Sequence, residues 1–284
     1  MDLEPPETAW RTLSYLLLAV VLTLAAALLR ADEPSTWTVS GNGAITAGSA
    51  GEVSQQYSAL YRWVLPGTAP AAGWRAVAGV DAEDTRFTGA QPPGTPTNLR
   101  SVSADLRVEY WQDDEVEANL ALRPGEYYQD RPSSGDEDVP IEAWSGVPIP
   151  GLKDLAGVLG LETARFYHHP IPIAGLVWTI NPTVRIEAFY PEPALVVTPN
   201  KTFTARLGGE LIGDGYLART LLGETPVEYY AYRLGASAQW KSGPINFSAA
   251  AGDEVEREFD FFRQRRRIHR GGRAYAELGI TWQP

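Results

Sequence analysis

Apolar and polar residues alternate with a period of two through most of the chain that follows residue 31. Between Val102 and Tyr110 the even positions are apolar or aromatic, and the odd positions carry serine, aspartate, arginine and glutamate. The same split recurs from Tyr230 to Trp240 and from Ala274 to Trp282. This period is typical of strands with one apolar and one polar face. It predicts about twelve antiparallel strands, with ten or fourteen also acceptable, near residues 35–47, 53–65, 73–88, 97–112, 115–124, 161–181, 183–190, 194–199, 201–213, 228–241, 244–262 and 268–283.

Such strands fit either a soluble barrel with its apolar face inward or a membrane barrel with that face toward lipid. The dense charge on the polar face favours the membrane barrel. Aromatic residues also gather at the predicted strand ends, as in the girdles of membrane barrels. The predicted girdle comprises Trp63, Tyr110, Trp111, Trp178, Tyr190, Tyr230, Trp240 and Trp282. We therefore predict an all-β, antiparallel, up-and-down transmembrane β-barrel.

The connections alternate between short and long, which is typical of periplasmic turns and outer loops. The longest predicted outer loop spans residues 124–160, and Leu152, Leu155, Val158 and Leu159 have helical spacing within it. This segment is expected to be an ordinary outer loop with one or two helical turns, or a lid folded into the lumen. Proline clusters in the connections, where it breaks no strand ladder.

The first 31 residues have the pattern of an export signal. Leu16 to Leu29 is a fourteen-residue apolar run interrupted only by Thr23, which suits a signal peptide and is short for a spanning helix. The few charges ahead of it are mostly acidic, so an uncleaved anchor is the alternative. Residues 32–284 then form the barrel domain, and an even strand number leaves both of its ends on the periplasmic side.

Composition narrows the classes of function. The chain of 284 residues has no cysteine, which excludes disulfides, thiolate catalysis and cysteine-ligated zinc. Its net charge of −11 argues against nucleic acid as a partner, because phosphate binding needs a basic face. No catalytic or cofactor-binding motif stands out, so we expect no cofactor and no metal.

Charged residues of both signs occupy the predicted lumen face. They are Arg107, Glu109, Glu117, Arg123, Arg185, Glu187, Arg206, Glu210, Arg233, Lys241, Arg273 and Glu277. They either line a selective channel or form ion pairs that fill a narrow interior. The mixture of signs favours the filled interior, because an open pore more often shows clusters of one sign.

A basic run occupies the last predicted outer loop. Its arginines are Arg263, Arg265, Arg266, Arg267 and Arg270. Arginine pairs phosphate with two parallel hydrogen bonds, so the run is a candidate contact for lipopolysaccharide phosphates. Alternatively, it balances the acidic residues of the preceding strand across the hairpin.

Several strand and turn patterns resemble a known family. They are Tyr61-Arg62-Trp63-Val64-Leu65-Pro66, Ile173-Ala174-Gly175-Leu176-Val177-Trp178, Tyr190-Pro191-Glu192-Pro193 and Gly272-Arg273-Ala274-Tyr275-Ala276-Glu277. Over residues 50–283 the chain is similar to an uncharacterised bacterial family of outer-membrane β-barrels, a domain of unknown function. The resemblance implies an outer-membrane location and supplies no catalytic residues.

The expected function is a passive narrow channel or a structural barrel with a charged, largely filled lumen. Its partners would be outer-membrane lipid, lipopolysaccharide and the machinery that inserts barrels. One alternative is an outer-membrane lipid hydrolase, which requires Ser and His side chains to converge near the outer rim. The other is a soluble exported barrel that binds a small apolar ligand, which requires the apolar side chains to point inward.

Overall fold

The computed structural model describes residues 37–48, 51–65, 73–112, 115–152, 154–220 and 223–283. The predicted export segment at residues 1–31 lies outside the described residues. Within the described ranges, every regular element is a strand except one short 3₁₀ turn, η1 (Phe262–Gln264). In the same ranges, no helix has the length and apolar character that crossing a membrane would require.

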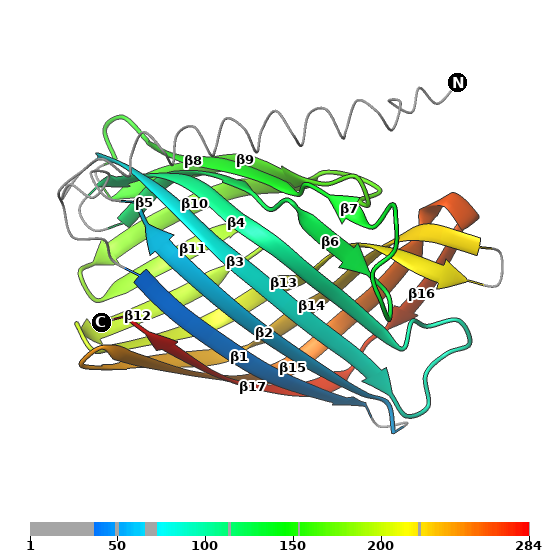
Figure 1. Cartoon of the computed structure of the whole chain (residues 1–284). Coiled ribbons are helices and arrows are strands. Elements are labelled where there is room, and N and C mark those ends of the chain that lie inside the picture. Colours follow the sequence, from blue (N-terminus) through cyan, green and yellow to red (C-terminus); the bar gives the residue numbers. More distant parts are fainter. Residues whose placement is uncertain are drawn as a thin grey trace.

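The strands form one closed antiparallel barrel (Figure 1). Fourteen of the 17 strands found in the described ranges build its wall, and β17 pairs with β1 from Val39↔Trp282 to Gly48↔Arg273, which closes the sheet. The fourteen are β1 (Trp37–Gly48), β2 (Val53–Val64), β3 (Gly73–Thr88), β4 (Asn98–Gln112), β5 (Glu115–Leu122), β8 (Ile141–Pro148), β9 (Leu155–Thr163), β10 (Ile171–Asn181), β11 (Val184–Tyr190), β12 (Ala194–Asn200), β13 (Phe203–Thr220), β14 (Gly223–Ser242), β15 (Ile245–Phe261) and β17 (Arg273–Trp282). The short strands β6 (Gly125–Tyr128), β7 (Glu137–Asp138) and β16 (Arg266–Arg270) pair beside them.

Over the residues that the structure describes, the wall has fourteen strands rather than about twelve. The difference lies in the predicted long loop at residues 124–160, which contains β6, β7, β8 and the start of β9. The apolar residues that fit a helix belong partly to β9, where Leu159 points outward and is exposed. Ala156, Val158 and Gly160 occupy the opposite face. Because both faces of β9 are apolar, the period of two is hidden in the sequence.

The two ends of the barrel differ in their connections. Turns of two residues, 182–183, 201–202 and 243–244, lie at one end, beside the C-terminal end of β17 (Figure 1). Longer connections, 89–97, 123–140 and 164–170, lie toward the other end. We call these the periplasmic end and the outer end, because membrane barrels have short periplasmic turns and long outer loops.

The facing of side chains over the periplasmic half confirms the membrane barrel. Leu234 and Ile280 point outward and are 44% and 49% exposed, whereas Arg233, next to Leu234, is 2% exposed inside the barrel. In a soluble barrel this arrangement would be reversed. The apolar stripe of each strand therefore forms an outer belt, and the charged stripe surrounds the lumen.

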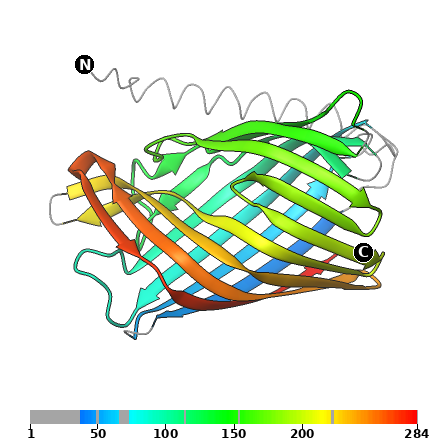
Figure 2. The same ribbon diagram turned by 180° about the vertical axis from the view of Figure 1, so that it is seen from behind.

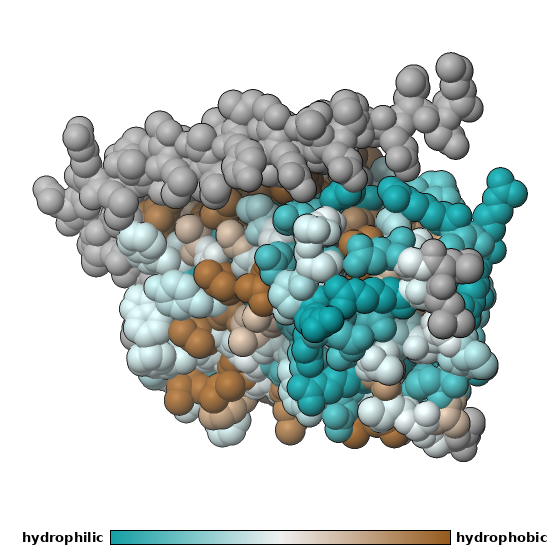
Figure 3. Space-filling model, turned by 45° about the vertical axis from the view of Figure 1, so that its right-hand side comes forward, coloured by the Kyte–Doolittle hydropathy of each residue, from teal (hydrophilic) through white to brown (hydrophobic). Residues whose placement is uncertain are grey.

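At the outer end the facing is inverted. Phe259 and Phe261 of β15 point inward and are buried, whereas Glu256 and Glu258 face outward, with Glu256 exposed and Glu258 covered by its neighbours. A β-bulge at Val255 shifts the strand by one residue, since Tyr232 pairs with Glu256 while Arg233 pairs with Glu254. Beyond the membrane the barrel therefore resembles a soluble protein, with an apolar interior and a polar surface. Figure 3 shows hydrophilic side chains gathered over this end and apolar ones on the wall beside it.

The wall of the outer half contains fewer strands than that of the periplasmic half. Strand β12 pairs with β13 only as far as Gly208, although β13 continues to Thr220 (Figure 2). Nearer the outer end, β6 pairs with β4 on one side. On its other side β6 pairs with β13 at Tyr128↔Leu217. Since barrel diameter grows with the number of strands, the outer half is narrower.

The connection 164–170 is fastened to β7 through one carboxylate. Asp138 accepts hydrogen bonds from the backbone N–H groups of Arg165 and Phe166, both at 3.0 Å. Burial raises the pKa of Asp138 above its usual range, although these hydrogen bonds oppose the rise. The connection thereby places Phe166 in the apolar interior of the outer half.

Candidate functional site

The centre of the barrel holds a buried group of ion pairs, which we call the central ionic cluster: Glu52, Arg233, Glu254, Arg257 and Arg273. The Glu254 side chain is fully buried between three arginines. Its carboxylate lies 2.8 Å from Arg257 Nη2, 3.4 Å from Arg273 Nη1 and 3.7 Å from Arg233 Nε. Arg273 also pairs with Glu52. The members come from the middle of β14 (Arg233) and of β15 (Glu254 and Arg257), from the first residue of β17 (Arg273) and from the connection between β1 and β2 (Glu52).

An apolar core fills the outer half of the lumen directly beyond this cluster. We call it the aromatic plug, and it comprises Phe87, Leu99, Tyr127, Phe166, Tyr216, Ala218, Val227, Tyr229, Ala231, Phe259, Phe261 and Ile268. The ring of Phe87 lies 5.1 Å from that of Phe259 and 5.4 Å from that of Tyr229, both edge-to-face. The guanidinium of Arg257 lies 5.3 Å from the Phe87 ring, so the plug and the central ionic cluster are in contact.

A second set of ion pairs lies on the β2–β4 side of the lumen. Asp105 is buried and accepts hydrogen bonds from Arg62 at 2.6 Å and from Arg107 at 2.7 Å. Arg123 is the residue that follows β5 in the sequence. It pairs with Glu162 of β9 inside the barrel. These pairs join opposite signs at short range, as an interior filled by salt bridges requires.

The other predicted lumen residues lie nearer the periplasmic end or at the edges of these two sets of ion pairs. Arg185 pairs with Glu187 at 2.7 Å, and Arg206 lies 3.7 Å from Glu187. Glu210 and Glu277 flank Arg233 at 3.9 and 3.4 Å, Glu109 accepts a hydrogen bond from Trp111, and Glu117 lies beside Gly146. Lys241 is exposed at the periplasmic end of β14, away from these pairs.

One small cavity lies among these charged side chains. A cavity of about 30 Å³ lies on the lumen side of β13 and β14 beside Arg206, Glu210 and Tyr275. That volume holds one or two water molecules. A larger hollow of about 580 Å³ is lined by apolar residues such as Leu195, Leu207 and Leu234, which face lipid. It is therefore no solute compartment of the lumen.

Sequence reasoning missed three residues that matter most to this interior: Glu52, Glu254 and Arg257. Glu254 belongs to a run of alternating acidic residues that ends at Asp260, which suggests a single face. The bulge at Val255 splits that run, so Glu254 points inward and Glu256 outward. The acidic residues alternate without a break from Glu254 to Asp260, so this pattern gave no signal for the bulge.

Most residues of the predicted aromatic girdle face the outer surface of the wall. Trp178, Tyr190, Trp240 and Trp282 are exposed large aromatics on the outer surface, Tyr110 packs against Trp74 at 5.2 Å, and Trp63 pairs with Trp37 across β1 and β2. Tyr230 points outward nearer the outer end of the barrel, opposite Glu258. Trp111 is the exception.

Trp111 lies on the lumen face of β4. Its indole N–H donates to Glu109 at 2.8 Å, and the guanidinium of Arg75 lies 4.0 Å from its ring. The alternation continues unbroken from Asp105 to Trp111, so its inward parity was readable from the sequence. The assignment to the girdle was wrong because it relied on residue type rather than on parity.

The arginines of the basic run contact different parts of the barrel. Arg267 lies 2.9 Å from Asp260 and 3.7 Å from Glu258, and Arg270 lies 3.2 Å from Glu52. Arg266 donates to the backbone oxygen of Pro93, and Arg265 adopts a left-handed conformation at the end of η1. Arg263 precedes it within η1. The contact of this run with lipopolysaccharide phosphates stays a prediction.

Two of the three histidines, His168 and His269, have carboxylate partners. His168 Nδ1 lies 3.1 Å from Asp260, and its ring stacks on His169 at 3.9 Å. His269 Nδ1 lies 2.6 Å from Glu258. Among the described residues, no serine hydroxyl is within hydrogen-bonding distance of these imidazoles. The arrangement that a serine hydrolase requires is therefore not found in that part of the chain.

The closed sheet, the apolar outer belt and the charged interior together define an outer-membrane β-barrel. No family model and no curated protein matches the chain. Among solved structures it is similar to the translocator domain of the autotransporter NalP from Neisseria meningitidis, with 10% identity, 97% of this chain and 96% of that chain covered, and a TM-score of 0.37.

Two further structures are similar. An outer-membrane channel from Pseudomonas putida has 7% identity, covers 90% of this chain and 98% of its own, and has a TM-score of 0.45. The β domain of the Bordetella autotransporter BrkA has 14% identity, 88% and 99% coverage, and a TM-score of 0.36. These neighbours are outer-membrane β-barrels, the class that the family resemblance implied.

Proposed function

We propose that the protein is a passive outer-membrane barrel that keeps its lumen closed at rest, with little or no ion conduction. The observation that carries this proposal is the stacking of the aromatic plug on the central ionic cluster. An ion that entered from the outer end would have to displace packed aromatic rings. It would next meet buried arginines already paired with Glu254.

The closed lumen predicts small or no currents in planar lipid bilayers. Insertion of the purified protein should raise the membrane conductance far less than a general porin does in the same cell and salt. Heat-modifiable migration on gels would confirm that the inserted protein is folded. Large, stable current steps from the unmodified protein would contradict the proposal.

Enlarging the interior should increase conduction if the plug is the barrier. The double variant Phe87→Ala, Phe259→Ala removes two rings that contact each other at 5.1 Å. We expect more frequent openings than for the unmodified protein, at a cost of about 3–5 kcal/mol in stability for each ring. Phe203→Ala and Phe247→Ala, which remove exposed rings from the outer surface, are the matched control and should leave conduction unchanged. An equal current from both variants would argue against the plug as the barrier.

A further inference from the structure

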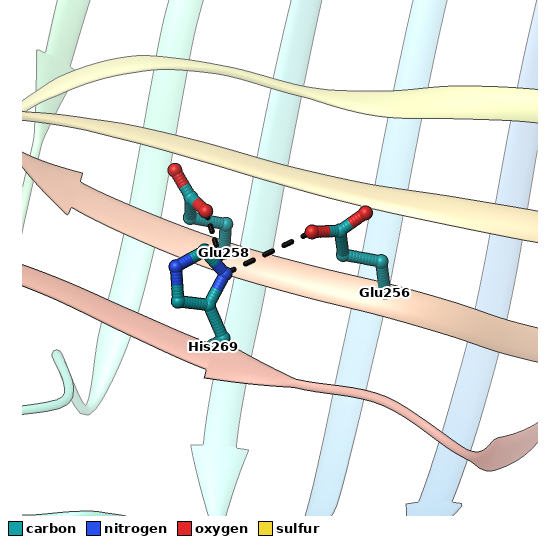
Figure 4. A group of neighbouring side chains, drawn as sticks. All are labelled: Glu256, Glu258 and His269. Carbon is teal, nitrogen blue, oxygen red and sulfur yellow. Dashed lines mark ion pairs between the residues drawn. The ribbon is translucent and has the colours of Figure 1, made fainter.

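Three metal-ligating side chains meet on the outer surface of the barrel, beyond the apolar belt. Glu256 and Glu258 are two residues apart on β15 and therefore share one face. His269 of β16 lies directly opposite Glu258 in the register. Figure 4 shows the imidazole directed between the two carboxylates.

The distances among these side chains suit a small cation. His269 Nδ1 lies 2.6 Å from Glu258 Oε2 and 3.7 Å from Glu256 Oε1. One ligand atom from each residue falls within 4.8 Å of the others. Ligand atoms in a tetrahedral zinc site, each about 2.1 Å from the ion, are separated by about 3.4 Å. The two observed distances bracket this spacing, so small side-chain rotations would bring three ligands to one ion.

The buried Glu258 carboxylate has a hydrogen bond with Tyr230 and has Arg267 at 3.7 Å, and a bound cation would add positive charge beside it. Its side chain is only 3% exposed although it faces outward, whereas Glu256 and His269 are 52% and 53% exposed. Burying a carboxylate is costly unless positive charge accompanies it. Arg267 lies closer to Asp260, at 2.9 Å, than to Glu258, at 3.7 Å. Glu256 and His269 are half exposed, so two of the three ligands are open to solvent.

The surroundings of the three ligands are acidic. Tyr230 of β14 lies opposite Glu258 on its other side, and Glu228 lies opposite Asp260 on the same outward face. His168, from the connection 164–170, is not among the ligands, because its Nδ1 lies 3.1 Å from Asp260. A cation bound by Glu256, Glu258 and His269 would therefore lie in a region of negative potential, with Arg267 as the nearby positive charge.

We propose that Glu256, Glu258 and His269 form a zinc-binding site on the outer surface, with water as the fourth ligand. An imidazole nitrogen beside two carboxylates favours zinc over magnesium and calcium, which prefer oxygen ligands alone. The site would tie β15 to β16 outside the barrel, while Phe259 and Ile268 of the same pair of strands complete the aromatic plug inside. This proposal does not depend on whether the lumen conducts.

The test is zinc binding by the full chain, folded in detergent, purified without a histidine tag and stripped with a chelator. We expect one equivalent of Zn²⁺ by calorimetric titration, little competition from Ca²⁺ or Mg²⁺, and a Co²⁺ absorption spectrum typical of tetrahedral coordination. His269→Asn and Glu256→Gln should each weaken binding by at least about tenfold, the loss that even changes outside the ligand set produce. Glu258→Gln should do the same if it folds.

The matched control is His169→Asn, because His169 stacks on His168 at the same end of the barrel and lies outside the three ligands. It should bind zinc as tightly as the unmodified chain. Heat-modifiable migration on gels checks that each variant is folded. If Glu258→Gln does not fold, the test rests on His269→Asn and Glu256→Gln. No zinc binding by the unmodified chain would overturn the proposal, and so would binding that both His269→Asn and Glu256→Gln leave unchanged.

Discussion

Replacing Glu254 with glutamine should destabilise the folded barrel by about 3–5 kcal/mol, the usual cost of breaking a buried ion pair from one side. The substitution keeps the shape of the side chain and removes its charge. Arg257 would lose its 2.8 Å partner, and two of its nitrogens, Nε and Nη1, already have no hydrogen-bond partner among the described residues. Arg233 and Arg273 would lose a counter-charge at the same time.

The comparison that isolates this effect is Glu256→Gln on the same strand. Glu256 has the same chemistry but is half exposed on the outer surface, so its change should alter stability by no more than about 0.5 kcal/mol. Both variants would be unfolded in urea from lipid vesicles with a chelator present, and the folded fraction followed by gel migration. Equal midpoints for the two variants would show that the central ionic cluster contributes little.

The central ionic cluster separates two regions of opposite character. Toward the periplasm, the outer surface must be apolar because it meets lipid, so the polar side chains turn inward. Toward the outer end, both the surface and the connections meet water, and an apolar interior becomes favourable. Arg257, paired with Glu254 and also lying 5.3 Å from the Phe87 ring, joins the two regions. In the proposed function, closure of the lumen thus follows from strands that continue beyond the membrane.

The alternation of residues predicted the membrane-spanning half well. Leu106, Leu234 and Ile280 belong to apolar stripes that the sequence shows directly, and Arg107, Arg206 and Arg233 belong to the opposite stripes. Each facing follows from parity alone, since a strand places successive side chains on opposite sides. No knowledge of distant contacts is needed for that step.

The parts that the sequence did not predict depend on local exceptions or on long-range pairing. Strand β9 has apolar residues on both faces, because Ala156 and Val158 point inward whereas Leu155 and Leu159 point outward. The resulting apolar run imitates the spacing of a helix. The bulge at Val255 reverses the parity of the end of β15. The pairing of β6 with β13 joins residues that are far apart in sequence, and no local pattern indicates such a contact.

Leu278→Arg is expected to weaken insertion of the barrel by about 2–4 kcal/mol, the cost of a charged side chain on the lipid face near the middle of the membrane. Leu278 is the most suitable position, because its side chain is 70% exposed and it lies midway along β17, opposite Gly43 of β1. No polar group of the neighbouring strands needs to move to admit the arginine. The change therefore measures transfer into hydrocarbon rather than disrupted packing.

Leu152→Arg is the matched control for this prediction. Leu152 is also exposed, but it lies in the turn between β8 and β9 at the periplasmic end, where the cost falls to about 0–1 kcal/mol. Folding into vesicles of defined acyl-chain length, followed by urea titration, gives both values. The difference between the two variants tests the membrane assignment itself, because on a soluble barrel both arginines would reach water and neither would carry a penalty.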